Sequence, residues 1–102
     1  MTTRKREMSP PTAAVLRAIT QGSSYGFDIM DATGLPSGTV YPILSRLEKR
    51  GLVVSRWEGP EAEREPGRPP RRYYAVTPAG SDALDVAIER FRTLGEPVPS
   101  RS

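Results

Sequence analysis

The chain contains no cysteine and no histidine among its 102 residues. Without cysteine it cannot form a disulfide framework, a thiolate zinc site or a cysteine nucleophile. Without histidine it has no imidazole base, no Ser-His-Asp triad and no common metal ligand. It also has no Gly-rich phosphate loop, and none of its acidic pairs has the spacing of a shared catalytic site. We therefore expect neither enzymatic activity nor a metal or other cofactor.

Long apolar runs are missing too, since the longest are only a few residues and a bilayer span needs about 20. The basic N-terminus is not followed by an apolar segment, so it does not resemble a secretory signal. These features favour a cytoplasmic protein. The length fits one domain with one core. The 11 prolines and 9 glycines cluster in places, which predicts a Pro/Gly-rich insert and a loose tail.

Positive charge is concentrated in two stretches of a chain whose net charge is +3. Residues 1–8 carry three basic and one acidic side chain, and residues 37–72 carry eight basic and five acidic ones. Such an asymmetry is typical of a nucleic-acid footprint, although charged runs are usually just solvated faces. We expect residues 1–8 to form a basic flexible arm, which either enters a DNA minor groove or is a simple tail.

Apolar periodicity predicts two helices near the N-terminus. The first follows a capping Ser9, and its apolar residues recur every three or four positions. The second starts at Ser24 and stops at Gly34, which is free to take a positive φ. We expect its aromatic residues Tyr25 and Phe27 to pack in the core or against a neighbouring helix.

A third helix is predicted from a capping Ser37 to Arg50. Its apolar residues cover one face about 100° wide. The opposite face has Gly38, Pro42 and Ser45, whose small size lets the backbone come close to another surface. Pro42 presses on the carbonyl four residues back, which lies in the first turn, where distortion costs least.

The second half of the chain predicts a β-hairpin and a last helix. Residues 52–58 and 71–76 are rich in β-branched and aromatic residues, and a polar Pro/Gly-rich loop joins them. Thr77 caps the last helix and Pro78 occupies its first position. We expect residues 95–102 to be disordered. The apolar stripe of the last helix consists of Leu84, Ile88, Phe91 and Leu94.

Three helices followed by a hairpin make a winged helix-turn-helix, an α+β fold that is mainly α. In this fold the third helix fits the DNA major groove, and the hairpin, or wing, reaches phosphates or the minor groove. We assign residues 9–78 to this DNA-binding domain and residues 79–94 to a C-terminal helix. Because the core has little room to cover the stripe of that helix, we expect it to form a homodimer.

Several motifs resemble the PadR family of bacterial transcriptional regulators. They are Ser-Tyr-Gly-Phe-Asp-Ile at 24–29, Gly-Thr-Val-Tyr-Pro at 38–42, Leu-Glu-Lys-Arg-Gly-Leu-Val at 47–53 and the run from Arg-Arg-Tyr-Tyr to Thr-Pro-Ala-Gly at 71–80. The resemblance covers residues 13–80 and departs mildly at Asp28, where glutamate is commoner. It implies a dimeric repressor of the small subclass with one C-terminal helix. Some members of the family leave DNA when they bind a small aromatic or drug-like molecule.

These arguments together define the candidate sites. The DNA-binding candidates are Ser37, Gly38, Thr39, Tyr41, Pro42, Ser45, Arg46, Lys49, Arg68, Arg71 and Arg72. The dimerisation candidates are the four residues of the C-terminal stripe. Tyr41 is either a phosphate contact or a partly buried flank of its helix, and Trp57 is either a ligand contact between protomers or a strand aromatic. The alternative for the whole chain is a winged-helix module for protein or RNA contacts without its own operator.

Overall fold

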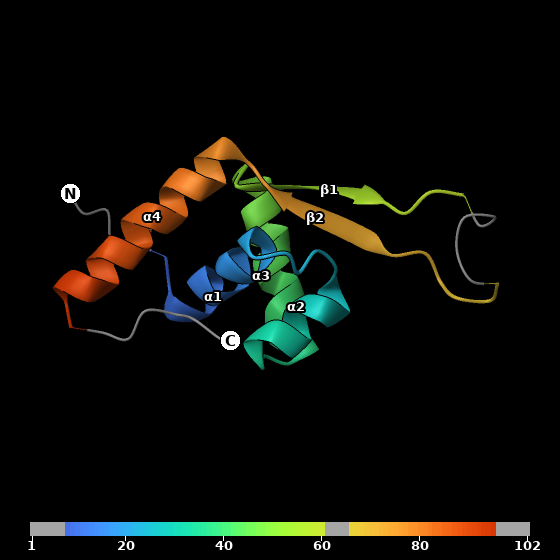
Figure 1. The fold of residues 1–102 in the computed structure, drawn as a ribbon, viewed down its shortest axis with the longest axis horizontal. Helices are drawn as coiled ribbons and strands as arrows, with labels where there is room; N and C mark the ends of the chain where they lie inside the picture. Colours follow the sequence, from blue (N-terminus) through green and yellow to red (C-terminus); the bar gives the residue numbers. More distant parts are fainter. Residues whose placement is uncertain (1–7, 61–65, 96–102) are drawn as a thin grey trace.

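The computed structural model describes residues 8–60 and 66–95. Its elements are, in order, α1 (Pro10–Thr20), α2 (Gly26–Thr33), α3 (Ser37–Lys49), β1 (Val53–Trp57), β2 (Arg72–Val76) and α4 (Pro78–Thr93) (Figure 1). The predicted fold, three helices, a two-stranded hairpin and a C-terminal helix, is confirmed. No helix in the described part of the chain combines the length and the apolar character needed to cross a membrane.

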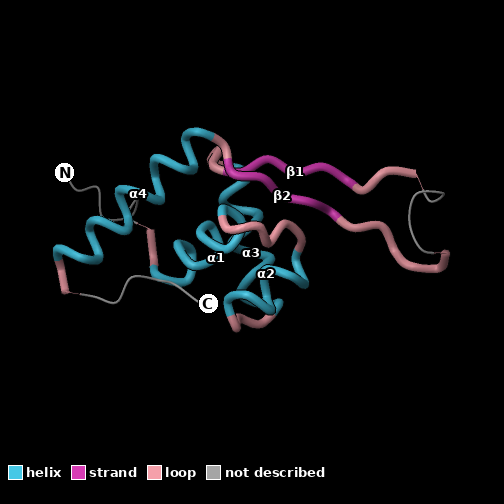
Figure 2. Tube along the Cα trace, viewed as in Figure 1, coloured by secondary structure: helices cyan, strands magenta, loops and turns pink. Residues whose placement is uncertain are grey.

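The four helices gather at one end of the molecule, and the hairpin extends away from them as an arm (Figure 2). β1 and β2 are antiparallel, with Val53 opposite Val76 and Trp57 opposite Arg72. The loop that joins the strands therefore lies at the far end of the arm. The hairpin therefore extends the surface of the molecule beyond the helices (Figure 2).

A short extended segment before α2 joins the hairpin to the helices. The N–H of Tyr74 donates to the carbonyl of Ser24 at 2.7 Å, and Tyr25 forms an isolated antiparallel bridge with Tyr73. The prediction that the second helix starts at Ser24 is therefore wrong. The backbone there pairs with β2, and the helix begins only at Gly26.

The core is shared by all four helices and the start of β1. Its buried apolar residues are Met8, Ala13, Val15, Leu16, Ala18, Ile19, Ile29, Val40, Ile43, Leu44, Leu47, Leu52, Val53, Leu84, Ala87 and Phe91. Met8 is 6% exposed, so the prediction that it belongs to a flexible arm is wrong. Residues 1–7 of that predicted arm, and residues 96–102 of the predicted tail, lie outside the described residues.

α4 packs against α1 within the same chain. Leu84 and Phe91 are 5% and 1% exposed, so the prediction that the core has little room to cover the stripe is wrong for these two residues. Arg90 on the same helix donates to the carbonyl of Met8 at 2.5 Å, which ties the segment before α1 to α4. Residues 79–94 therefore do not form a separate unit from residues 9–78, because both segments contribute to one core.

The capping residues predicted from the sequence are confirmed at most helix ends. Ser9 accepts a hydrogen bond from the N–H of Thr12 at 3.3 Å, and Thr77 accepts one from Gly80 at 3.0 Å. Gly34 ends α2 with a φ of 77°. Ser37, in contrast, is not a cap, because Pro36 holds that position and Ser37 is the first residue of α3.

Candidate nucleic-acid interface

α3 presents a face of short side chains to solvent. Val40, Ile43, Leu44 and Leu47 point into the core, whereas the exposed residues are Ser37, Gly38, Tyr41, Pro42, Ser45, Arg46 and Lys49. A Cβ atom added at Gly38 would meet nothing within 4 Å, so the first turn stands clear of the rest of the chain. Thr39 is half-buried on one edge of this face.

Two cations lie at the C-terminal end of the same helix, Arg46 and Lys49. No described residue forms a hydrogen bond or an ion pair with either side chain. Their charges are therefore available to an anionic ligand that lies along α3.

Tyr41 occupies the flank of α3 that faces α2 and the hairpin. Its ring lies against Gly26, where an added Cβ would collide with the tyrosine hydroxyl. The side chain is nevertheless 49% exposed. Tyr41 thus packs α3 on the start of α2, while half of its surface stays open to a ligand.

Arg71 stands at the outer end of the paired strands, directly before β2. Its guanidinium lies 4.2 Å from the ring centroid of Tyr25, in a cation–π arrangement. Tyr25 in turn makes an edge-on contact with Tyr73, with centroids 5.8 Å apart. No side-chain hydrogen bond or ion pair of Arg71 exists within the described residues, so its guanidinium donors are open to a ligand.

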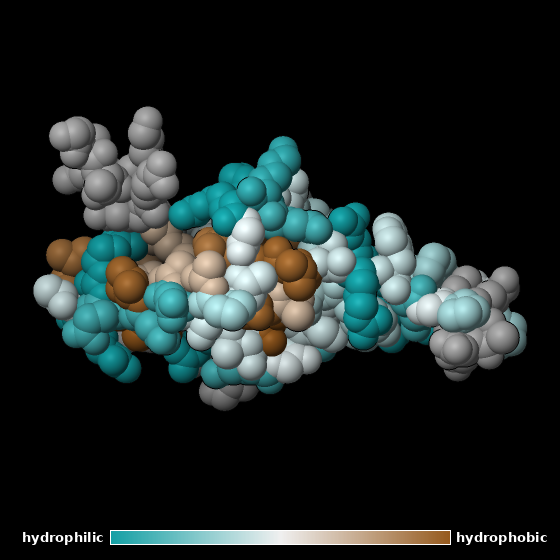
Figure 3. Space-filling view, turned by 90° about the horizontal axis from the view of Figure 1, so that it is seen from above, coloured by the Kyte–Doolittle hydropathy of each residue, from teal (hydrophilic) through white to brown (hydrophobic). Residues whose placement is uncertain are grey.

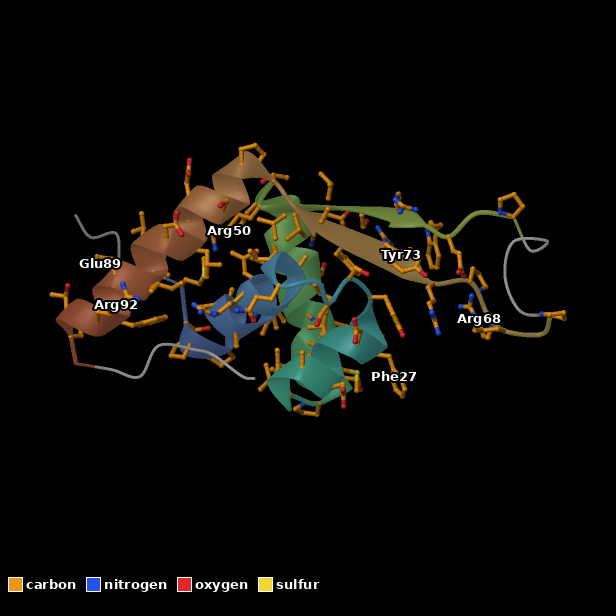
Figure 4. The ribbon with its side chains drawn as sticks, in the orientation of Figure 1. Phe27, Arg50, Arg68, Tyr73, Glu89 and Arg92 are labelled. Carbon is orange, nitrogen blue, oxygen red and sulfur yellow. The ribbon has the colours of Figure 1, made fainter. Side chains whose placement is uncertain are left out.

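Arg68, labelled in Figure 4, forms an ion pair with Glu58 across the hairpin. Its Nη2 donates to Glu58 Oε2 at 2.7 Å, and the same carboxylate accepts from the N–H of Arg71 at 3.2 Å. The hydrogen bond from Arg68 is the main cause that lowers the pKa of Glu58, opposed by partial burial. Residues 61–65 of the loop between the strands lie outside the described residues.

Arg72 is linked to both β1 and α3. Its Nε donates to the hydroxyl of Ser55 at 2.9 Å, and its Nη2 lies 3.4 Å from Glu48 Oε1. The Ser55 hydroxyl donates to Glu48 Oε2 at 2.7 Å. This network could not be predicted from the sequence, because no local periodicity relates residues that lie 24 positions apart.

A groove of about 730 Å³ lies between the wing and the helices. Its lining consists of Tyr25, Gly26, Phe27, Tyr41, Trp57, Arg68, Pro69, Pro70, Arg71, Arg72 and Tyr74. Trp57 is 59% exposed, and the Arg72 guanidinium lies 5.5 Å from its ring centroid. No residue of α4 lines this groove, so Trp57 lies beside the face of α3 and away from the C-terminal helix.

Phe27 was expected to pack in the core or on a helix, and it does neither. It is 74% exposed and points away from the helices (Figure 4). Ile29 lies two positions further along α2, about 200° around the helix from Phe27, and it faces the core with no exposed surface. Phe27 therefore lines the groove with a side chain that is mostly exposed to solvent.

A model described as the transcriptional regulator PadR-like family matches residues 15–86. The chain belongs to the PadR-like family. This regulator is therefore a DNA-binding protein that controls transcription, and its family is not one of enzymes. No curated protein matches this PadR-like chain closely enough to add to the assignment.

Several solved structures have a fold similar to that of this chain. A PadR family regulator from Clostridium difficile R20291 has a TM-score of 0.72 at 24% identity, covering 85% of this chain and 92% of that chain. A PadR-like transcription factor from Bacteroides fragilis has a TM-score of 0.70 at 24% identity, covering 82% of both chains. BpsR from Bordetella bronchiseptica, whose DNA binding is regulated by 6-hydroxynicotinic acid, has a TM-score of 0.69 at 19% identity, covering 88% of this PadR-like chain and 64% of its own.

Proposed function

We propose that this PadR-like protein is a homodimeric, sequence-specific repressor that binds a double-stranded operator in the cytoplasm. The observation that carries the proposal is the outward face of α3, which combines short side chains with two cations that have no partner in the described chain. Such a helix fits the major groove, where base edges differ between all four base pairs. A protein or RNA partner would not require this combination of small side chains and cations on one helix face.

The N-terminal half of α3 is proposed to read the bases. Gly38 and Pro42 allow close approach of the backbone, and the hydroxyls of Ser37, Thr39, Tyr41 and Ser45 supply donors and acceptors. Arg46 and Lys49 follow at the other end of the helix, where they would contact phosphates. The wing would contact the backbone or the minor groove through Arg71, whose donors are open, whereas Arg68 and Arg72 already have acidic partners.

Selection of bound duplexes from a random pool tests this function. A symmetric dimer predicts two half-sites whose centres lie about 10 base pairs, or a multiple of that, apart. Ser45→Ala is then expected to lower the ratio of operator to random affinity while leaving the salt dependence unchanged. If no sequence is enriched, the chain is instead a winged-helix module for protein or RNA contacts.

The dimer is proposed to form through the surface of α4 that the core leaves exposed. Val86 and Leu94 are 69% and 60% exposed, and Ile88 is partly buried. Apolar side chains are visible on the α4 end of the molecule when it is seen from above (Figure 3). A second copy of the chain would cover them, and Leu84 and Phe91 would support this interface from within the core.

Release from DNA by a small aromatic ligand is supported by the groove beside Trp57. Five aromatic side chains line it, and arginines lie among them. BpsR has a similar fold, and its DNA binding is regulated by 6-hydroxynicotinic acid, an aromatic acid. Titration with 6-hydroxynicotinic acid should change the emission of Trp57 and weaken DNA binding, and unchanged emission would contradict this part of the proposal.

A further inference from the structure

One hydrogen-bonded network connects the recognition helix to both strands of the wing. Glu48 comes from the last turns of α3, Ser55 from β1 and Arg72 from β2. The Ser55 hydroxyl donates to Glu48 Oε2 at 2.7 Å and accepts from Arg72 Nε at 2.9 Å. Arg72 Nη2 closes the ring on Glu48 at 3.4 Å. We call these three residues the helix–wing brace.

The brace fixes the orientation of the arm relative to α3. The hairpin is anchored at its base by the core residue Val53, but Trp57 at the outer end of β1 is 59% exposed. Charge-assisted hydrogen bonds are stronger and more directional than neutral ones, so the brace limits rotation of the strands on α3. It also occupies Nε and Nη2 of Arg72, two positions from which that guanidinium would otherwise bind a phosphate.

A carboxylate at this place weakens the attraction of the protein to DNA. Glu48 lies on the helix proposed to enter the major groove, and both strands of the duplex carry phosphate charge. A neutral residue here would favour non-specific binding. The contribution of the Glu48 carboxylate is therefore to hold the wing in place and to favour the operator over other DNA, and not to raise the affinity for DNA.

We propose that Glu48 is a positioning residue for DNA recognition. It holds the wing at one spacing from α3, so that base contacts from the helix and backbone contacts from Arg71 are made together, and it keeps Arg72 from acting as a phosphate contact. This inference rests on the proposed function, and it reassigns Arg72 from the predicted DNA contacts to the brace.

Glu48→Ala is the main test, with dissociation constants measured for the selected operator and for a random duplex over a range of salt concentrations. Operator affinity should fall about tenfold, the order of one mismatched base pair. Random affinity should stay the same or rise, and its salt slope should steepen by about one unit per protomer, because Arg72 is freed to bind phosphate. Asp31→Ala is the matched control, since it removes the same charge from an exposed position on α2.

Two further variants separate positioning from a general defect of the fold. Glu48→Gln keeps an oxygen that accepts from Ser55, so it should retain part of the operator preference that alanine loses. Arg72→Ala should lower operator preference without flattening the salt slope for random DNA. Added to Glu48→Ala, it should cause no further loss of preference, because both changes break one network.

Several outcomes would overturn the inference. Equal loss of affinity for both duplexes in Glu48→Ala would indicate partial unfolding, and a result identical to Asp31→Ala would show that the brace has no role. A salt slope that drops by about one unit in Arg72→Ala would make Arg72 a phosphate contact. If no operator can be selected, the proposed function fails, and hydrogen exchange of the hairpin amides in free protein still decides whether Glu48→Ala loosens the wing.

Discussion

The guanidinium of Arg71 lies 4.2 Å from the ring centroid of Tyr25, the residue directly before α2. A cation–π contact at an exposed site contributes about 0.5–1 kcal/mol. The guanidinium of Arg71 forms no hydrogen bond or ion pair within the described residues, so its N–H donors are not used by this contact. Arg71 is thus positioned relative to the helices while its hydrogen-bonding capacity stays open to a phosphate.

Arg71→Ala should weaken binding to operator and to random DNA by a similar factor, because a phosphate contact carries no sequence information. The salt slope should flatten by about one unit per lost contact in each protomer. Quantitative gel shifts at several salt concentrations measure both effects. Loss of operator preference with intact random binding would reverse the roles and make the wing the reader.

Gly38→Ala should separate stability from recognition. The added Cβ meets nothing within 4 Å, and the position is helical, so the variant should be about 0.5–1 kcal/mol more stable. The same methyl group would stand between α3 and the base edges, so operator affinity should fall. Calorimetry and operator titration give the two readings, and an unchanged operator affinity would show that this turn does not approach DNA.

Gly80→Ala is the contrasting substitution at a buried glycine. Its Cβ would collide with the backbone carbonyl of Leu52, and Val76 Cγ1 would lie 3.0 Å away. Because a backbone atom cannot swing aside as a side chain does, we expect a loss of about 2–3 kcal/mol in the free energy of unfolding. Denaturant titration measures it, and a wild-type midpoint would show that β2 and α4 adjust freely at their junction.

The pH dependence of stability should change in Glu58→Gln. The hydrogen bond from Arg68 lowers the pKa of Glu58 below its ordinary value of 4.5. The folded state therefore gains stability from the ionised carboxylate above that pH and loses it as the pH falls through the lowered pKa. At pH 7 the melting temperature of the wild type should lie above that of the variant. The difference between the two melting temperatures should be smaller at pH 3. A difference that stays constant would mean that the Arg68–Glu58 pair does not contribute through ionisation of the carboxylate.

Val86→Asp and Phe91→Ala should distinguish the surface of α4 from its core face. Val86 is 69% exposed, so Val86→Asp should weaken the dimer in sedimentation experiments without unfolding the chain. Phe91 is 1% exposed, and Phe91→Ala should cost about 3–5 kcal/mol of stability. A wild-type protein that sediments as a monomer at micromolar concentration would contradict the proposed dimer itself.

The sequence by itself determined the elements and most of their ends, because caps, proline and helical periodicity act over three or four residues. Thr77 and Pro78 start α4, and Gly34 stops α2, as their local chemistry requires. The order of the elements then limited the fold to a winged helix-turn-helix, and the motif at residues 38–42 indicated the family. Both conclusions depend on patterns along the chain, which can be read without coordinates.

The tertiary structure alone decided which faces are covered and which charges are paired. Phe27 and Phe91 both lie on helices, yet the first is exposed and the second is buried, because the face of α2 that carries Phe27 points away from the core whereas α4 packs on α1. Likewise, Arg71 and Arg72 are neighbours in sequence, but their alternation on the strand carries one to Tyr25 and the other to Glu48. Such contacts join residues far apart in the chain, and only the packing of whole elements brings them within reach.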